Sequence, residues 1–290
     1  KNELLVYLWN NHRDFFKKNL VRLKRMNECC NSISYRRRLE TGDYQLVWGS
    51  FCKYDKACIA CATKRAMRMI KKFATWVYEN KLTWKKWYYI VLTISHKSHE
   101  SFATVMWRLI KFKEKLGKAY RNSKRESQSN KSFFHKFDWM VMSIEVTYWE
   151  NWWHPHINIL ACTDDEIDID YNKYNWNKKK KYKNWEPVPT LTNESLKNEW
   201  RKITKWSYIH NIRKINVIDQ HFSRSGIWEV FKYALKFSSM TVEQLAEIVI
   251  AQVKHQYRYF STYGIFRGWE QGVWKKFDGE RKEVEMIYNK

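Results

Sequence analysis

The sequence has little glycine and little proline, and it lacks a long apolar run. Eight glycines and three prolines in 290 residues exclude a collagen-like or low-complexity chain. No stretch approaches the roughly 18 uncharged apolar residues that a membrane-spanning helix needs. The first 19 residues carry charged and asparagine side chains at positions where a secretion signal is apolar. We therefore expect a protein without a membrane partner.

Acidic residues are scarce relative to basic ones. The chain has 54 Lys and Arg against 30 Asp and Glu, so its formal net charge is +24. The basic residues are spread along the chain, which favours a folded basic surface over a basic tail. Aromatic residues make up 17% of the chain, which excludes a disordered protein. Aromatic and basic residues alternate closely at 84–89 and 171–185. This combination predicts nucleic-acid binding, with an anionic membrane surface as the alternative.

Apolar periodicity predicts a mixture of helices and strands. Because the order of elements is irregular and the strands alternate in polarity, we expect an α+β fold. Its core is a central antiparallel β-sheet flanked by helices. Residues 163–189 are expected to form an exposed insertion. The expected helices are 1–28, 62–78, 102–120, 194–205, 226–237 and 241–259, and the expected strands are 87–94, 139–148, 154–162 and 211–219.

Five of the six cysteines lie between residues 29 and 61. Cys52, Cys58 and Cys61 form a C-x5-C-x2-C pattern, whose last pair can reach one ion from a tight turn. Either Cys29 or Cys30 would supply the fourth thiolate of a closed, structural zinc site. Buried thiols without metal are the alternative. Cysteines in a Lys-rich chain of this kind indicate an intracellular protein, and we expect a cytoplasmic location.

A second candidate site is an H-x-H pattern on an expected strand. Successive side chains of a strand alternate between its faces, so His154, His156 and Asn158 share one face. Two imidazoles placed in this way can bind one divalent cation. Glu145 lies on the preceding strand and would complete the site if the two strands are antiparallel neighbours. Pro155 removes an amide donor, which predicts that the strand begins at an edge or a bulge. His96, His99 and His135 receive no role.

A third candidate site is a tyrosine on the expected helix 226–237. Glu229, Tyr233 and Lys236 have the spacing of one helical face. A nearby ammonium or metal would favour the phenolate, which is the nucleophilic form of tyrosine. A salt-bridged surface helix is the alternative.

These three patterns, in this order, resemble the rolling-circle replication initiators of small bacterial plasmids, within the HUH endonuclease class. FCKYDKACIACATKRAMR is similar to the Cys-rich block of that family, with Ile59 in place of a proline. YYIVLTI resembles its apolar first motif, and IEVTYWENWWHPHINIL resembles its metal-binding second motif. EVFKYALK resembles its third motif, and residues 257–266 resemble a closing segment. Asn158 departs from the family, in which a third His is common.

The resemblance implies a single-tyrosine enzyme. Tyr233 would attack one DNA phosphodiester, giving a 5′-phosphotyrosine link and a free 3′-OH. His154, His156 and Glu145 would hold Mn or Mg. Lys236 would offset charge in the transition state or lower the pKa of Tyr233, and Glu229 would activate a water that ends the reaction. A single-tyrosine HUH transposase and a non-catalytic zinc-dependent nucleic-acid-binding regulator are the competing interpretations.

The resemblance also implies DNA as the partner, in a bacterial cytoplasm. The enzyme would bind a single-stranded nick site and a flanking duplex or hairpin origin, and host helicase and polymerase would follow. Arg65, Arg68 and Lys232 are the candidate DNA-binding residues. The expected division is an N-terminal helical and zinc-binding region at 1–85, a catalytic domain at 86–240 and a C-terminal helical segment at 241–290.

Overall fold

The structure of this protein is a computed structural model. The residues that it describes are 2–37, 39–40, 42, 44–55, 57–97, 99–125, 132–149, 152–172, 190–205, 207, 210–215, 226–231 and 240–264.

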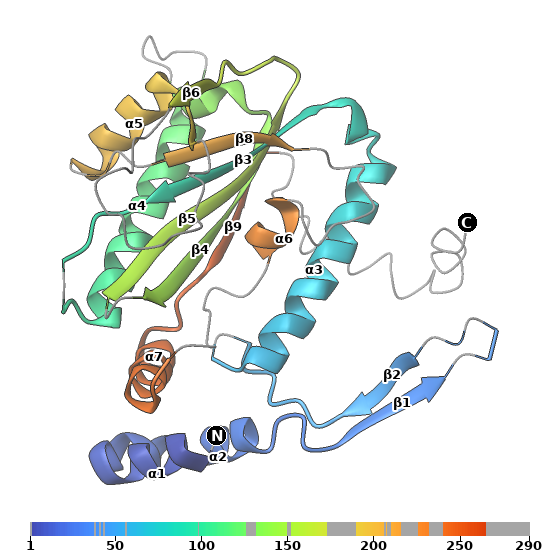
Figure 1. The fold of residues 1–290 in the computed structure, drawn as a ribbon, viewed down its shortest axis with the longest axis vertical. Coiled ribbons are helices and arrows are strands. Elements are labelled where there is room, and N and C mark those ends of the chain that lie inside the picture. The colour runs from blue at the N-terminus through green and yellow to red at the C-terminus, as the bar shows by residue number, and fades with distance from the viewer. Residues whose placement is uncertain are drawn as a thin grey trace, which may run out of the picture.

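A five-stranded antiparallel sheet lies at the centre of the described molecule (Figure 1). Its strand order is β8-β3-β5-β4-β9, so β5 is flanked by two long partners. Both faces of β5 carry apolar residues along its second half, as suits a strand buried between two layers. The predicted α+β fold with a central antiparallel sheet is confirmed. The strands are β3 (Lys86–Thr93), β4 (Trp139–Trp149), β5 (Trp152–Thr163), β8 (His210–Ile215) and β9 (Phe260–Tyr263).

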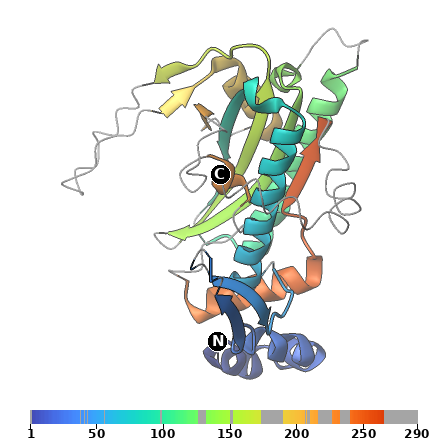
Figure 2. The ribbon, with the colours of Figure 1, turned by 90° about the vertical axis from the view of Figure 1, so that its right-hand side faces the viewer.

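Helices cover both faces of this sheet (Figures 1 and 2). On one face, α4, α5 and α7 pack on Ile90, Ile157 and neighbouring apolar residues. On the other face, α3 and α6 enclose an aromatic cluster in which the rings of Trp87 and Trp139 lie 4.4 Å apart. The sheet therefore has one fully covered face and one face shared by α3, α6 and the polar residues described below. The helices are α3 (Ile59–Glu79), α4 (Phe102–Ser123), α5 (Glu194–Thr204), α6 (Gly226–Phe231) and α7 (Val242–His255).

The N-terminal part consists of two helices and a small separate sheet. The expected single helix over 1–28 is wrong, because the chain leaves helical geometry at His12, where φ is −138°. The break lets Leu8 and Leu23 bury in one apolar cluster together with Val249 of α7. The elements of this part are α1 (Asn2–Asn11), α2 (Arg13–Asn27), β1 (Ile33–Arg37) and β2 (Tyr44–Gly49).

The remaining described elements are short. Strand β6 (Asp170–Asn172) lies in the expected insertion and pairs with β7 (Thr190–Thr192), which directly follows the insertion, and residues 173–189 lie outside the described residues. Single turns of 3-10 helix occur at Leu82–Trp84 and Phe133–Lys136. The domain boundaries at 85 and 240 stay predictions, although β9 lies beyond the second one and pairs with β4. No helix in the described ranges is long and apolar enough to cross a bilayer.

Lys113 of α4 places an ammonium group in the core. Its replacement measures how much this buried charge lowers the stability of the fold. Its side chain is 3% exposed and donates a hydrogen bond to the carbonyl of Arg258. Burial lowers the pKa of Lys113 to about 8 from 10.5. Between these values the unfolded chain binds the extra proton, so stability rises with pH through this window. We expect Lys113→Met to raise the free energy of unfolding at pH 7 by up to about 3 kcal/mol.

Urea denaturation at pH 7 and at pH 10.5 measures this effect. The gain should shrink at pH 10.5, where lysine in the unfolded chain also begins to lose its proton. Lys118→Met, on an exposed position of the same helix, is the control and should change stability little. A gain that is the same at both pH values would show that the ammonium is not the cause.

Candidate active site and metal centre

The H-x-H pattern lies on β5, on the sheet face that α3 and α6 share. His154 and His156 are half-buried there, whereas Pro155 and Ile157 are buried on the opposite face. Asn158 continues the polar row and is only 1% exposed. The row thus runs from a partly open end at the histidines to a closed end at Asn158.

Glu145 joins this row from the neighbouring strand. β4 and β5 are antiparallel neighbours, and their register sets Glu145 directly opposite His156. The Glu145 carboxylate is 7% exposed, and its Oε2 accepts a hydrogen bond of 2.8 Å from Nδ2 of Asn158. Oδ1 of Asn158 in turn accepts a hydrogen bond of 3.0 Å from the Tyr89 hydroxyl on β3. The amide thus fixes the orientation of the carboxylate, which is the kind of support that metal-ligating carboxylates have.

The third strand orients His156. Thr93 of β3 lies opposite His156, and its hydroxyl is 3.1 Å from Nδ1 of the imidazole. An imidazole whose Nδ1 is held in this way can coordinate a cation through Nε2. Strands β3 and β5 therefore supply the groups that position His156 and Glu145.

His96 is a member of this cluster that sequence reasoning missed. Its ring lies against the ring of His154, with centroids 4.9 Å apart, and 5.8 Å from that of Trp152. Burial lowers the pKa of His96, and the neighbouring His154 lowers it further, so the imidazole is neutral at pH 7. A neutral imidazole is the form that binds a metal. The β3–β5 register ends at Thr93 and His156, so no strand pattern in the sequence marks His96 as a neighbour of His154.

Pro155 explains how His96 is held. The expectation that the strand begins at an edge is confirmed on one side, since β3 pairs with β5 only from His156 onward and the ladder partner of Pro155 is Val146 of β4. Ile94 donates its amide to the Pro155 carbonyl at 3.2 Å, but proline has no amide to return. The Ile94 carbonyl is instead 3.3 Å from Nδ1 of His96. The missing donor is on the side where β3 has already ended, so the sheet loses one bond only.

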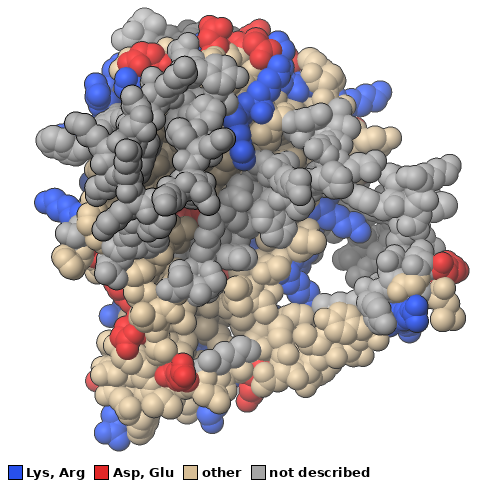
Figure 3. Space-filling model, viewed as in Figure 1, with Lys and Arg blue, Asp and Glu red and all other residues tan. Residues whose placement is uncertain are grey.

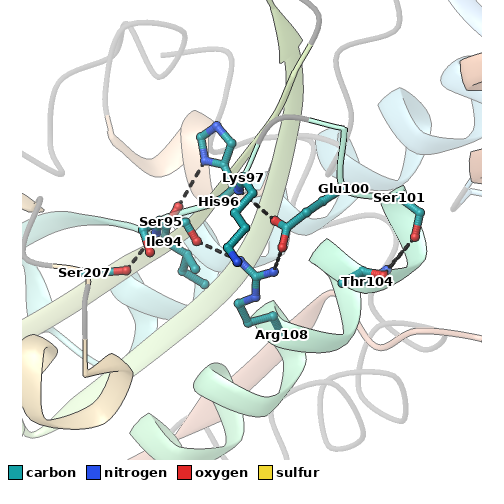
Figure 4. Close-up of polar contacts among 9 residues, drawn as sticks. All are labelled: Ile94, Ser95, His96, Lys97, Glu100, Ser101, Thr104, Arg108 and Ser207. Atoms are coloured by element: carbon teal, nitrogen blue, oxygen red, sulfur yellow. Dashed lines mark hydrogen bonds and ion pairs between the residues drawn. The ribbon is translucent and has the colours of Figure 1, made fainter.

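A polar network fixes the loop that carries His96 (Figure 4). Ser207 accepts a hydrogen bond of 2.7 Å from the amide of Ser95, and Arg108 of α4 donates one of 2.8 Å to the Ser95 carbonyl. Glu100 pairs with Arg108 and accepts the amide of Lys97 at 3.0 Å. Both sides of His96 are therefore tied to helix α4 and to the segment before β8.

The candidate metal ligands at this face are three imidazoles and one carboxylate, and they lie along the polar row, which is partly open at its histidine end. Donors of this kind suit a divalent cation such as Mn. In the described ranges, the one group of three or more Cys, His, Asp or Glu whose ligand atoms all lie within 4.8 Å of one another is formed by cysteines. The histidine cluster therefore offers residue types that can bind a divalent cation, but its ligand atoms are not all as close together as those of the cysteine group.

Helix α6 carries the first residues of the third sequence motif and packs on the same face. Ile227, Val230 and Phe231 are buried against the aromatic cluster of the sheet. Val230 and Phe231 also line a small cavity together with Ser143, which is two positions from Glu145 on β4. The side chain of Glu229 lies outside the described residues, as do Lys232, Tyr233 and Lys236. The described end of α6, at Phe231, thus lies near Ser143, which is opposite Asn158 of the polar row.

A separate cysteine group joins three segments of the N-terminal part. Cys29 follows α2, Cys52 follows β2, and Cys58 and Cys61 lie at the start of α3. Their four sulfur atoms lie within 4.8 Å of one another and could hold a metal such as zinc. Sulfur pairs are separated by 3.4 Å (Cys58–Cys29), 3.5 Å (Cys52–Cys61) and 3.6 Å (Cys29–Cys61). A tetrahedral zinc with Zn–S bonds of about 2.3 Å needs sulfur atoms about 3.8 Å apart, so the group fits the ion.

The geometry distinguishes Cys29 from Cys30. The sulfur of Cys30 is 3.9 Å from that of Cys29 and does not belong to the compact group. Backbone amides of Cys52 and Tyr54 point at the sulfurs of Cys29 and Cys52, at 3.5 and 3.4 Å. A hydrogen bond from Cys52 lowers the pKa of Cys58 to about 5, whereas burial raises that of Cys61 to about 11. The thiol of Cys58 therefore loses its proton more readily than that of Cys61.

The two arginines proposed for DNA binding lie on α3, next to the cysteine group. Arg65 pairs with Asp55 at 2.8 Å, and Arg68 lies one turn further along the helix. Both line the same cleft, which also reaches Cys61. The structure thus groups these side chains beside the N-terminal part, and Arg65 also lines the small cavity that contains Ser143, Val230 and Phe231.

Comparison with known proteins gives one informative relative. A curated protein from Bacillus amyloliquefaciens named Protein rep is 25% identical over 145 residues, which are 47% of this chain. The match covers 38% of that protein, so the chain spans well under two thirds of its length. No family model matches the chain, and no solved structure matches it. The chain is therefore similar to a Rep protein over about half of its residues.

Proposed function

We propose that this protein nicks and rejoins DNA to initiate rolling-circle replication of a small plasmid. The observation that carries the proposal is the position of α6, which leads into Tyr233 and packs on the face that presents Glu145, His154 and His156. Similarity to a Rep protein supports the same function. The net charge of +24 suits a polyanionic substrate.

In the proposed site, His154, His156 and Glu145 hold Mn or Mg, with His96 as an additional imidazole. When bound, the cation polarises the scissile phosphate as a Lewis acid. Asn158 and Thr93 act as positioning residues, because they orient the Glu145 carboxylate and the His156 ring. Asn158 occupies the strand position where a third histidine is common in the family. In the proposed site, the imidazole of His96, from the loop after β3, takes the place of that histidine.

The nucleophile is the phenolate oxygen of Tyr233. It attacks phosphorus, the bond from phosphorus to the 3′ oxygen breaks, and that oxygen takes up a proton as the free 3′-OH. The phosphotyrosine ester keeps the phosphodiester bond energy, so the later rejoining needs no ATP. Lys236 offsets charge in the transition state. Glu229 takes a proton from the water that ends the reaction.

The test is covalent capture on DNA. The full chain is incubated with Mn and a supercoiled plasmid that carries its origin, and the protein–DNA adduct is isolated and digested with trypsin. We expect mass spectrometry to find the nucleotide on the peptide that contains Tyr233. Nicking at transposon-end single strands instead of the origin would favour the transposase. Binding without any metal-dependent nick would favour a zinc-dependent regulator and overturn the proposal.

His96→Ala tests the composition of the cation site. Because His96 packs on His154 and is held by the Ile94 carbonyl, its removal should weaken Mn binding by about 10- to 100-fold. Isothermal titration with Mn measures the affinity, and the Mn concentration needed for half-maximal nicking should shift in parallel. His99→Ala is the matched control, since His99 is exposed in the same loop. Equal effects of the two substitutions would remove His96 from the site.

A further inference from the structure

β1 and β2 form a two-stranded ribbon that is separate from the central sheet (Figures 1 and 2). All five residues of β1 are exposed, and Tyr35 and Trp48 are 58% and 59% exposed. An isolated two-stranded ribbon is marginally stable in water, so it needs an anchor. The anchor is at its base, where Ser50 accepts the amide of Cys30 at 2.7 Å and donates its own amide to Ser32 at 2.9 Å.

The ribbon carries cations and exposed rings. The sequence places arginine at 36, 37 and 38, and the structure describes Arg36 and Arg37, both exposed on β1. Consecutive strand residues point to opposite faces, so one of these two guanidinium groups lies on each face of the ribbon. Exposed arginines beside Tyr35 and Trp48 make this ribbon poorly suited to packing on the protein itself.

A cationic cleft lies between the base of the ribbon and α3. Its volume is about 800 Å³, and Figure 3 shows blue side chains beside the opening between the ribbon and the rest of the molecule. The one acidic residue of its lining, Asp55, is paired with Arg65. Nζ of Lys64 lies 3.6 Å from the ring of Phe51, which borders the same cleft. The basic residues of the lining are Lys53, Lys64, Arg65, Arg68 and Lys72.

Three of these cations form one face of α3. Lys64, Arg68 and Lys72 follow one another at spacings of four residues, which places them on one side over about 12 Å of helix. The other side of α3 is apolar and buries Phe73 and Trp76 against the sheet. The helix therefore joins the core on one side and presents a row of positive charge to the ribbon on the other.

We propose that the ribbon and the cationic face of α3 together grip double-stranded DNA beside the nick site. The major groove admits a two-stranded β-ribbon, and lysine and arginine bind its flanking phosphates. The cysteine group lies at the hinge, because its ligands precede the ribbon, follow it and begin α3. A metal held by these sulfurs would fix the ribbon relative to α3. The identification of the duplex as DNA rests on the proposed function. The inference that the ribbon and α3 bind a nucleic-acid duplex does not.

The test measures binding of the full chain to two fluorescein-labelled probes. One probe is a 24-base-pair DNA duplex of random sequence, and the other is one of its strands alone. Arg36→Ala/Arg37→Ala and Lys64→Ala/Lys72→Ala should each weaken duplex binding at least tenfold in 0.15 M salt. Each pair should also reduce the slope of log affinity against log salt by about 2. The affinity for the single strand should stay within twofold.

Lys111→Ala/Lys118→Ala removes the same charge from exposed positions of α4, on the other side of the sheet, and is the control. Circular dichroism and zinc content verify that each variant is folded. A loss of duplex affinity equal to that of the control, or an equal loss for both probes, would overturn the inference. Nicking of a single-stranded origin oligonucleotide is measured separately, so a chain that binds duplex without nicking would contradict the proposed function alone.

Discussion

Tyr233→Phe is expected to abolish formation of the protein–DNA adduct and to lower nicking by at least about 10⁴-fold, equivalent to about 5.5 kcal/mol in the barrier. The substitution removes only the phenolic oxygen, which is the atom that bonds to phosphorus in the proposed mechanism. The ring remains, and so do the cation ligands on β4 and β5, which lie on other elements of the fold. Affinity for the origin should therefore stay within about twofold of that of the unmodified chain.

Gel separation of the covalent adduct measures the first effect, and fluorescence anisotropy with the same oligonucleotide measures binding. Tyr78→Phe is the matched control, because Tyr78 is 69% exposed on α3, and it should leave both quantities unchanged. Normal adduct formation by Tyr233→Phe would assign the nucleophile to another residue. Equal loss of binding and nicking would indicate a structural role for Tyr233 instead.

The arrangement of the polar row could be predicted from the sequence because it depends on local rules. Alternation along β5 places His154 and His156 on one face, and the short connection to β4 makes the two strands antiparallel neighbours. The register that sets Glu145 opposite His156 follows from the apolar residues that each strand must bury. These elements needed no knowledge of distant contacts.

The position of His96 could not be predicted in the same way. It depends on Pro155, which deprives the Ile94 carbonyl of its partner, and on a network with Arg108 and Ser207. Those residues are far apart in the sequence, so no periodic pattern connects them. The break of the N-terminal helix at His12 is similar, because it serves the contact of Leu8 with α7.

The choice between Cys29 and Cys30 also required the fold. Both residues precede the ribbon, and spacing alone gives each a path to Cys58 and Cys61. The left-handed backbone at Cys30, where φ is 66°, rotates its side chain relative to that of Cys29. Whether Cys29 or Cys30 joins the other three sulfurs therefore depends on the backbone angle φ of Cys30, which the local sequence does not determine.

Cys58→Ser is expected to lower the zinc content from one ion per chain to below about 0.1 and to release the N-terminal part. Structural zinc contributes about 10–16 kcal/mol of apparent binding free energy in small zinc peptides. Here the four sulfurs join α2, the ribbon and α3, and the buried apolar surface around them is small. Loss of one thiolate should therefore expose the 29–58 segment to proteases, while the sheet and its two helical layers stay folded.

Zinc is measured by atomic absorption, and cleavage by limited proteolysis followed by mass spectrometry. Cys30→Ser is the matched control, since its sulfur is 3.9 Å from that of Cys29 but outside the compact group, and it should keep one zinc per chain. Because protons compete with zinc for thiolates, acidification should release the ion from the unmodified chain and reproduce the cleavage pattern of Cys58→Ser. A zinc-loaded Cys58→Ser beside a zinc-depleted Cys30→Ser would reverse the assignment. Thiols that react equally before and after treatment with a chelator would show that the group is simply a set of reduced cysteines packed together.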